Sequence, residues 1–159
     1  MGARADALAK RFEGKVQEAT TVFEKLSDAD WKKVTSAEKW SVGVVAHHVA
    51  MGHEGIGRIV RTVSAGEAMP HFTMDMLHAM NAKHAQEHAG CTKAETLALH
   101  QKNAAAAATL VRGLGDAELA KKGTVLAGMP PMSVEEIVNG ILISHIDEHC
   151  GSIGATVGR

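Results

Sequence analysis

Residues 41–65 read SVGVVAHHVAMGHEGIGRIVRTVSA, and their apolar pattern is the clearest structural signal in the chain. Ser41 is a residue type that often caps the start of a helix, and no proline interrupts the stretch after it. Apolar or small residues recur there at steps of three and four, as on one face of an α-helix. They are Val45, Val49, Gly52, Ile56, Ile59 and Val63. We therefore predict an amphipathic helix over residues 42–65, with His47 and His48 in its first half.

Similar signals predict further helices on both sides of this one. Thr92 and Ser133 each begin a capping box, Thr-Lys-Ala-Glu and Ser-Val-Glu-Glu, which marks the start of a helix. Besides residues 42–65, the expected helices span residues 3–26, 73–88, 92–114 and 134–156. Residues 115–132 form the longest connection, with one helical turn expected in it, and no segment shows the sustained alternation of a strand. The chain is therefore predicted to be all-α, a four-helix bundle with one extra short helix, in a single domain over residues 1–159.

The composition argues against several kinds of partner. Lys+Arg 17 against Asp+Glu 18 leaves a formal net charge of −1, and aromatic residues make up only 3%, so a nucleic-acid-binding surface is not expected. No apolar run approaches the roughly 18 residues that a membrane span needs. The N-terminus shows no secretory signal, and Cys91 and Cys150 are most simply reduced thiols, so a cytoplasmic protein is expected.

The histidines suggest a metal site. The chain has ten of them, and His145 and His149 lie four residues apart, on the apolar face of the last expected helix. His48 lies beside the apolar face of the helix over residues 42–65. Three inward imidazoles from two packed helices could bind one divalent ion and leave other coordination positions open, as a catalytic site needs. Alternatively, these side chains are packed core histidines, or His47 replaces His48 as a ligand.

The remaining histidines carry weaker signals. His84 and His88 are also four residues apart, but their polar neighbours predict a solvent-exposed face. His100 is expected to line the interior, three residues after an apolar Leu97. Glu148 lies three residues after His145 and is the candidate catalytic residue, as a proton acceptor or as a partner that orients an imidazole. The alternative for Glu148 is an exposed helix carboxylate. Histidine ligands suit several metals, of which zinc and nickel are favoured, with iron and manganese as alternatives.

Two segments resemble a known family. Trp40-Ser-Val-Gly-Val-Val-Ala-His-His48 resembles the opening of the second helix in the DinB/YfiT-like superfamily. His145-Ile-Asp-Glu-His149-Cys-Gly-Ser-Ile153 resembles its closing segment, although Ser152 stands where a glutamine is usual. The resemblance implies a four-helix bundle that binds a divalent ion through His48, His145 and His149, and it implies frequent homodimers.

The resemblance also implies an activity. Members of the superfamily include transferases and an isomerase that use low-molecular-weight thiols. We therefore expect a metal-dependent thiol S-transferase that acts on small electrophiles. The alternatives are a metal-dependent hydrolase and a non-catalytic metal-binding protein of the stress response.

Overall fold

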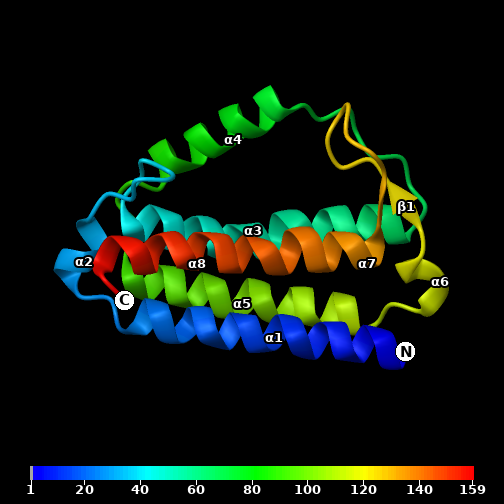
Figure 1. Ribbon diagram of the computed structural model, residues 1–159, viewed down its shortest axis with the longest axis horizontal. Coiled ribbons are helices and arrows are strands. Elements are labelled where there is room, and N and C mark those ends of the chain that lie inside the picture. Colours follow the sequence, from blue (N-terminus) through cyan, green and yellow to red (C-terminus); the bar gives the residue numbers. More distant parts are fainter. Residues whose placement is uncertain (1) are drawn as a thin grey trace.

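The computed structural model describes residues 2–159 and confirms the predicted all-α four-helix bundle. Figure 1 shows long helical rods lying side by side. They are α1 (Ala3–Glu24), α3 (Val42–Ser64), α5 (Lys93–Arg112) and a last rod made of α7 (Val134–Ile137), η1 (Val138–Ile143) and α8 (Ser144–Val157). None of the helices within residues 2–159 is both long and apolar enough to cross a lipid bilayer.

The extra helix expected over residues 73–88 is α4 (Met74–Glu87). It lies apart from the bundle in Figure 1, on the side of α3, and none of its residues is buried. At its N-terminal end, the backbone N–H of Ala127 donates to the carbonyl oxygen of Phe72 over 2.8 Å. At its C-terminal end, His84 reaches back to His47 of α3. Because α4 buries no residue, polar contacts rather than an apolar face hold it beside the bundle.

Short elements connect the long helices. They are α2 (Asp28–Lys32), α6 (Asp116–Leu119), β1 (Lys122–Gly123) and β2 (Met132–Ser133). The sequence predicted the helical turn at α6 but no strand. β1 and β2 pair in antiparallel fashion, with Lys122 opposite Ser133. Strands this short show no alternation of apolar and polar residues, so the pattern along the chain could not reveal them.

The helix starts form as the capping signals predict. The Ser41 hydroxyl accepts a hydrogen bond from the backbone N–H of Val44 over 3.2 Å. Both predicted capping boxes, at Thr92 and Ser133, are present with their reciprocal hydrogen bonds. These caps satisfy backbone N–H groups that have no partner inside the helix.

The last rod contains a π-helical segment, η1, between α7 and α8. A π-helix has a wider turn than an α-helix, so η1 changes which residues of the rod face the core. Val138 and Leu142 are buried, and Ile146 follows them into the core. The buried face of the rod after this segment is therefore offset by about one residue from the apolar face on which the sequence places His145. His145 consequently lies at the edge of the core rather than in its centre.

Candidate metal centre

The structure brings His48 of α3 together with His145 and His149 of α8. Nε2 of His48 lies 3.0 Å from Nε2 of His145. One ring nitrogen of each histidine lies within 4.8 Å of the other two, and all three residues are half-buried. Nitrogen ligands at 2.0–2.1 Å from a tetrahedral zinc ion lie about 3.4 Å from one another. Small side-chain movements would therefore bring the three nitrogens onto one ion.

Glu38 orients His149. Its Oε1 lies 2.8 Å from Nδ1 of His149, and its Oε2 accepts a hydrogen bond from the Ser152 hydroxyl over 2.6 Å. Burial raises the pKa of Glu38, but hydrogen bonds from Ser152, Thr35 and His149 outweigh it and hold the pKa below its ordinary value. The carboxylate is therefore ionised at neutral pH, and Nδ1 of His149 carries the proton that it accepts. This tautomer leaves the Nε2 lone pair of His149 free to bind a metal.

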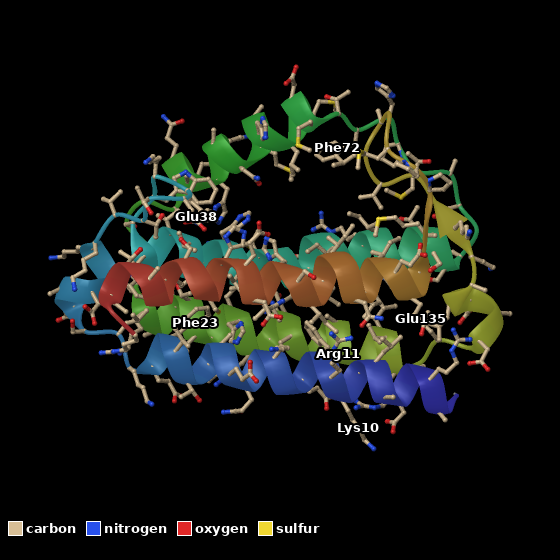
Figure 2. All side chains as sticks on the ribbon, viewed as in Figure 1. Lys10, Arg11, Phe23, Glu38, Phe72 and Glu135 are labelled. Carbon is tan, nitrogen blue, oxygen red and sulfur yellow. The ribbon has the colours of Figure 1, made fainter. Side chains whose placement is uncertain are left out.

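The sequence alone did not point to Glu38. It lies in the connection between α2 and α3, at the end of the bundle nearest the C-terminal half of α4 (Figure 2). The next residue, Lys39, has a φ of 64°, a left-handed conformation that is uncommon for a residue with a side chain. The backbone N–H of Thr35 donates to the carbonyl oxygen of Trp40 over 2.8 Å and closes this turn. A positive φ and a cross-loop hydrogen bond leave no periodic signal in a sequence.

Gly52 makes room for the His145 ring. A Cβ atom on Gly52 would lie 2.5 Å from Cε1 of His145 and 2.7 Å from its Nδ1. Both distances are shorter than a van der Waals contact. The ring of His145 can therefore reach His48 only because residue 52 has no side chain. Nδ1 of His145 is buried and has no hydrogen-bond partner within residues 2–159.

The environment keeps the imidazoles of His48 and His145 neutral. Burial, together with the neighbouring His149 and His84, lowers the pKa of His48 to about 3. Burial, together with His48 and His149, lowers the pKa of His145 to about 2. A neutral imidazole offers a lone pair to a metal, whereas a protonated one does not. The donor set, the oriented tautomer of His149 and the space left by Gly52 all fit a divalent transition metal.

Glu148 lies beside the site in the chain but outside the histidine cluster. Its side chain is exposed, and no hydrogen bond or ion pair of that side chain is found in the described part of the chain. The neighbouring Asp147 forms an ion pair with Lys15 of α1, at 3.0 Å. A role for Glu148 in proton transfer therefore stays a prediction, while Glu38 is the carboxylate that contacts a histidine of the cluster, His149.

The prediction that His84 and His88 form a solvated face is wrong. Both residues are half-buried, and Nε2 of His84 lies 2.8 Å from Nδ1 of the buried His47. The rings of His47 and His88 stack with their centroids 4.2 Å apart. His47 therefore belongs to a second cluster, whereas His48 belongs to the first. The polar neighbours Lys83 and Glu87 are exposed and pair with each other. Consecutive side chains leave a helix about 100° apart, so His84 and His88 can face His47 of α3 while these neighbours face solvent.

The bundle and the histidine site define a DinB-like helical protein with residues suited to metal binding. The chain belongs to the family described as the mycothiol maleylpyruvate isomerase N-terminal domain, which it matches over residues 4–137. This confirms the resemblance to the DinB/YfiT-like superfamily. The match ends before His145 and His149, so the case for these two residues rests on their geometry. No protein of curated function matches the chain significantly.

Two solved structures illustrate the fold. The crystal structure of the mycothiol-dependent maleylpyruvate isomerase has a TM-score of 0.75 and 12% sequence identity, over 97% of this chain and 64% of that chain. YfiT from Bacillus subtilis, described as a "probable metal-dependent hydrolase with an unusual four-helix bundle topology", has a TM-score of 0.79 and 16% identity, over 99% of this chain and 90% of its own. At these identities the likeness establishes the fold and not the activity.

Proposed function

We propose that the protein is a metal-dependent enzyme that uses a low-molecular-weight thiol and acts on a small electrophile. The observation that carries this proposal is the half-buried cluster of His48, His145 and His149, with His149 oriented by Glu38. Three protein ligands leave at least one position of a metal open, which distinguishes catalytic from structural sites. The family of the chain and its similarity to a mycothiol-dependent isomerase support a thiol as the second reactant.

Each residue has a separate task in this proposal. His48, His145 and His149 would hold the divalent ion, for which imidazole ligands favour zinc or nickel. Such an ion, when bound, supplies a positive charge that favours the thiolate form of a thiol and polarises an acceptor group. Glu38 keeps His149 in the tautomer that binds through Nε2. Glu148 is exposed next to His149, and it is the residue that we propose to accept the thiol proton.

The proposal is tested by turnover assays on protein loaded with zinc or nickel. The assays combine a cellular thiol (mycothiol, bacillithiol or glutathione) with a haloaromatic, an epoxide or maleylpyruvate. We expect turnover that requires both metal and thiol and that falls at least about 100-fold in His145→Ala, because the loss of a ligand removes the metal. His78→Ala is the control, since His78 is exposed and belongs to neither cluster.

Two results would contradict a thiol-dependent reaction. One is the absence of turnover with every cellular thiol, in protein whose metal content is verified by elemental analysis. The other is metal-dependent cleavage of esters or amides without any thiol. The second result would favour the alternative of a metal-dependent hydrolase, which the similarity to YfiT supports.

A further inference from the structure

A second group of three histidines lies next to the first. Nδ1 of His47 lies 2.8 Å from Nε2 of His84, and the ring of His88 stacks on that of His47 with an interplanar angle of 23°. One ring nitrogen of each lies within 4.8 Å of the other two. His47 is buried, and its two partners are half-buried. The three side chains therefore converge as closely as those of the first group.

The two groups are separate sets of ligands. His47 and His48 are consecutive residues of α3, so their side chains leave the helix about 100° apart. His48 turns towards His145 of α8, and His47 turns towards α4. The groups adjoin, since the ring centroids of His48 and His84 are 5.5 Å apart, but no histidine belongs to both.

Hydrogen bonding within the second group leaves it incompletely satisfied. Among residues 2–159, the ring nitrogens of these three histidines form one hydrogen bond, between His47 and His84. Nδ1 of His84 is buried and has no partner in this part of the chain. The first group also has an unpartnered buried nitrogen, Nδ1 of His145, but its His149 has Glu38 as a partner. Three gathered imidazoles with an unpartnered buried nitrogen are a donor set for a transition metal, since nitrogen ligands suit zinc, nickel and copper.

We propose that His47, His84 and His88 bind a second transition-metal ion, which fastens α4 to α3. The position of α4 gives this ion a task. No residue of α4 is buried, so little apolar surface holds the helix in place. His84 lies in the last turn of α4, His88 is the residue that caps its C-terminal end, and His47 lies on α3. A metal bound by all three would join the two helices beside the first cluster. This structural role does not depend on the enzymatic activity proposed above.

The proposal is tested by the number of zinc ions bound per chain, measured by equilibrium dialysis and elemental analysis of untagged protein. We expect two ions in the wild type and one in His84→Ala or His88→Ala. His145→Ala should also retain one ion, because it removes only the first site. His78→Ala, a change of an exposed histidine in the same helix, should retain two.

Amide hydrogen exchange distinguishes zinc bound by His47, His84 and His88 from zinc bound elsewhere on the protein. Some α4 amides exchange only when the helix detaches from the bundle. At a free zinc concentration 100 times above the Kd, their exchange should slow by up to about 100-fold. The same slowing is expected in His145→Ala and not in His84→Ala. Two bound ions in His84→Ala would overturn the proposal. So would a single bound ion in the wild type that is lost only in His145→Ala, or hydrogen exchange of α4 that zinc does not slow. Loss of the second ion alone in His84→Ala, with the first site intact, would support it.

Discussion

Gly52 shows how a missing side chain can shape a binding site. It lies one turn after His48 in α3, and a Cβ atom there would meet the His145 ring at 2.5 Å. We predict that Gly52→Ala displaces the ring and lowers zinc affinity at the first site at least about 10-fold, a typical effect of disturbing a ligand's surroundings. The binding constant can be measured by competition with a zinc chelator.

The same helix provides the control for this prediction. Gly55 is exposed, and nothing lies within 4 Å of a Cβ atom added to it. Gly55→Ala should therefore keep the wild-type zinc affinity and raise the free energy of unfolding by about 1 kcal/mol, because alanine favours a helix over glycine. Equal zinc affinities for Gly52→Ala and Gly55→Ala would contradict the role that we assign to Gly52.

We predict different effects on zinc affinity for substitutions of Glu38 and Glu148. Glu38→Gln replaces the carboxylate that accepts the Nδ1 proton of His149, so we predict a 10- to 100-fold loss of zinc affinity, within the usual range for such partners. Glu148→Gln should leave zinc affinity unchanged, because its exposed side chain contacts no ligand histidine, and should lower only the turnover rate. Unchanged zinc binding in Glu38→Gln would show that the carboxylate does not position the ligand.

At the scale of the elements, the helices could be predicted closely because their signals are local. The helix predicted over residues 42–65 is observed as Val42–Ser64, and the helix predicted over residues 73–88 is observed as Met74–Glu87. A side-chain cap such as Ser41 bonds to a backbone N–H within four residues, so both partners lie in the same short stretch of sequence. The pairing of His145 with His149 in α8 is equally local, since residues four apart share a helix face.

The features that could not be predicted depend on contacts distant in the chain. Residues 138–143 form a π-helical turn, and they carry no local signal, such as a proline, that predicts it. Glu38 reaches His149 across more than a hundred residues through a turn with a positive φ at Lys39. The sequence predicts a solvent-exposed His84 because nothing near it in the chain reveals its partner, His47 on a different helix. Patterns within one helix cannot show what faces it.

At the scale of the whole molecule, two more histidines are buried in the bundle. Nε2 of His100 lies 3.2 Å from the carbonyl oxygen of Val16, so this nitrogen carries a proton and donates it. Nδ1 of His100 then accepts a hydrogen bond from Nε2 of His53 over 3.0 Å. Burial and the neighbouring His100 lower the pKa of His53 to about 3. Burial also lowers the pKa of His100, although its bond to Val16 opposes the shift. The centre of the bundle is therefore a neutral imidazole pair.

These buried imidazoles make the metal-free protein sensitive to mild acid. The pKa of His53 is about 3 in the folded protein against an ordinary value of 6.5, so between these pH values the unfolded chain binds more protons. Their contribution to stability is complete above pH 6.5 and is lost as the pH falls towards the folded pKa, by up to about 1.4 kcal/mol per pH unit for each such histidine. The pKa values of Asp6 and Glu13 are also lowered, but these carboxylates make stability depend on pH only near and below their ordinary pKa values of 3.8 and 4.5. Stability lost between pH 6.5 and 5 therefore reports on histidines.

We predict that urea unfolding in the presence of a chelator gives a free energy of unfolding that falls steeply from pH 6.5 to pH 5. A double variant, His53→Leu with His100→Leu, removes both partners of the pair together, so neither is left with an unpaired nitrogen. Its free energy of unfolding should fall less steeply with pH than that of the wild type, by up to about 1.4 kcal/mol per pH unit for the loss of His53, with a further contribution in the same direction from His100. His48 and His145 remain in this variant and account for the residual slope, because burial also lowers the pKa of each. A wild-type free energy of unfolding that is constant from pH 7 to pH 5 would mean that these imidazoles are already protonated or hydrated in the folded protein.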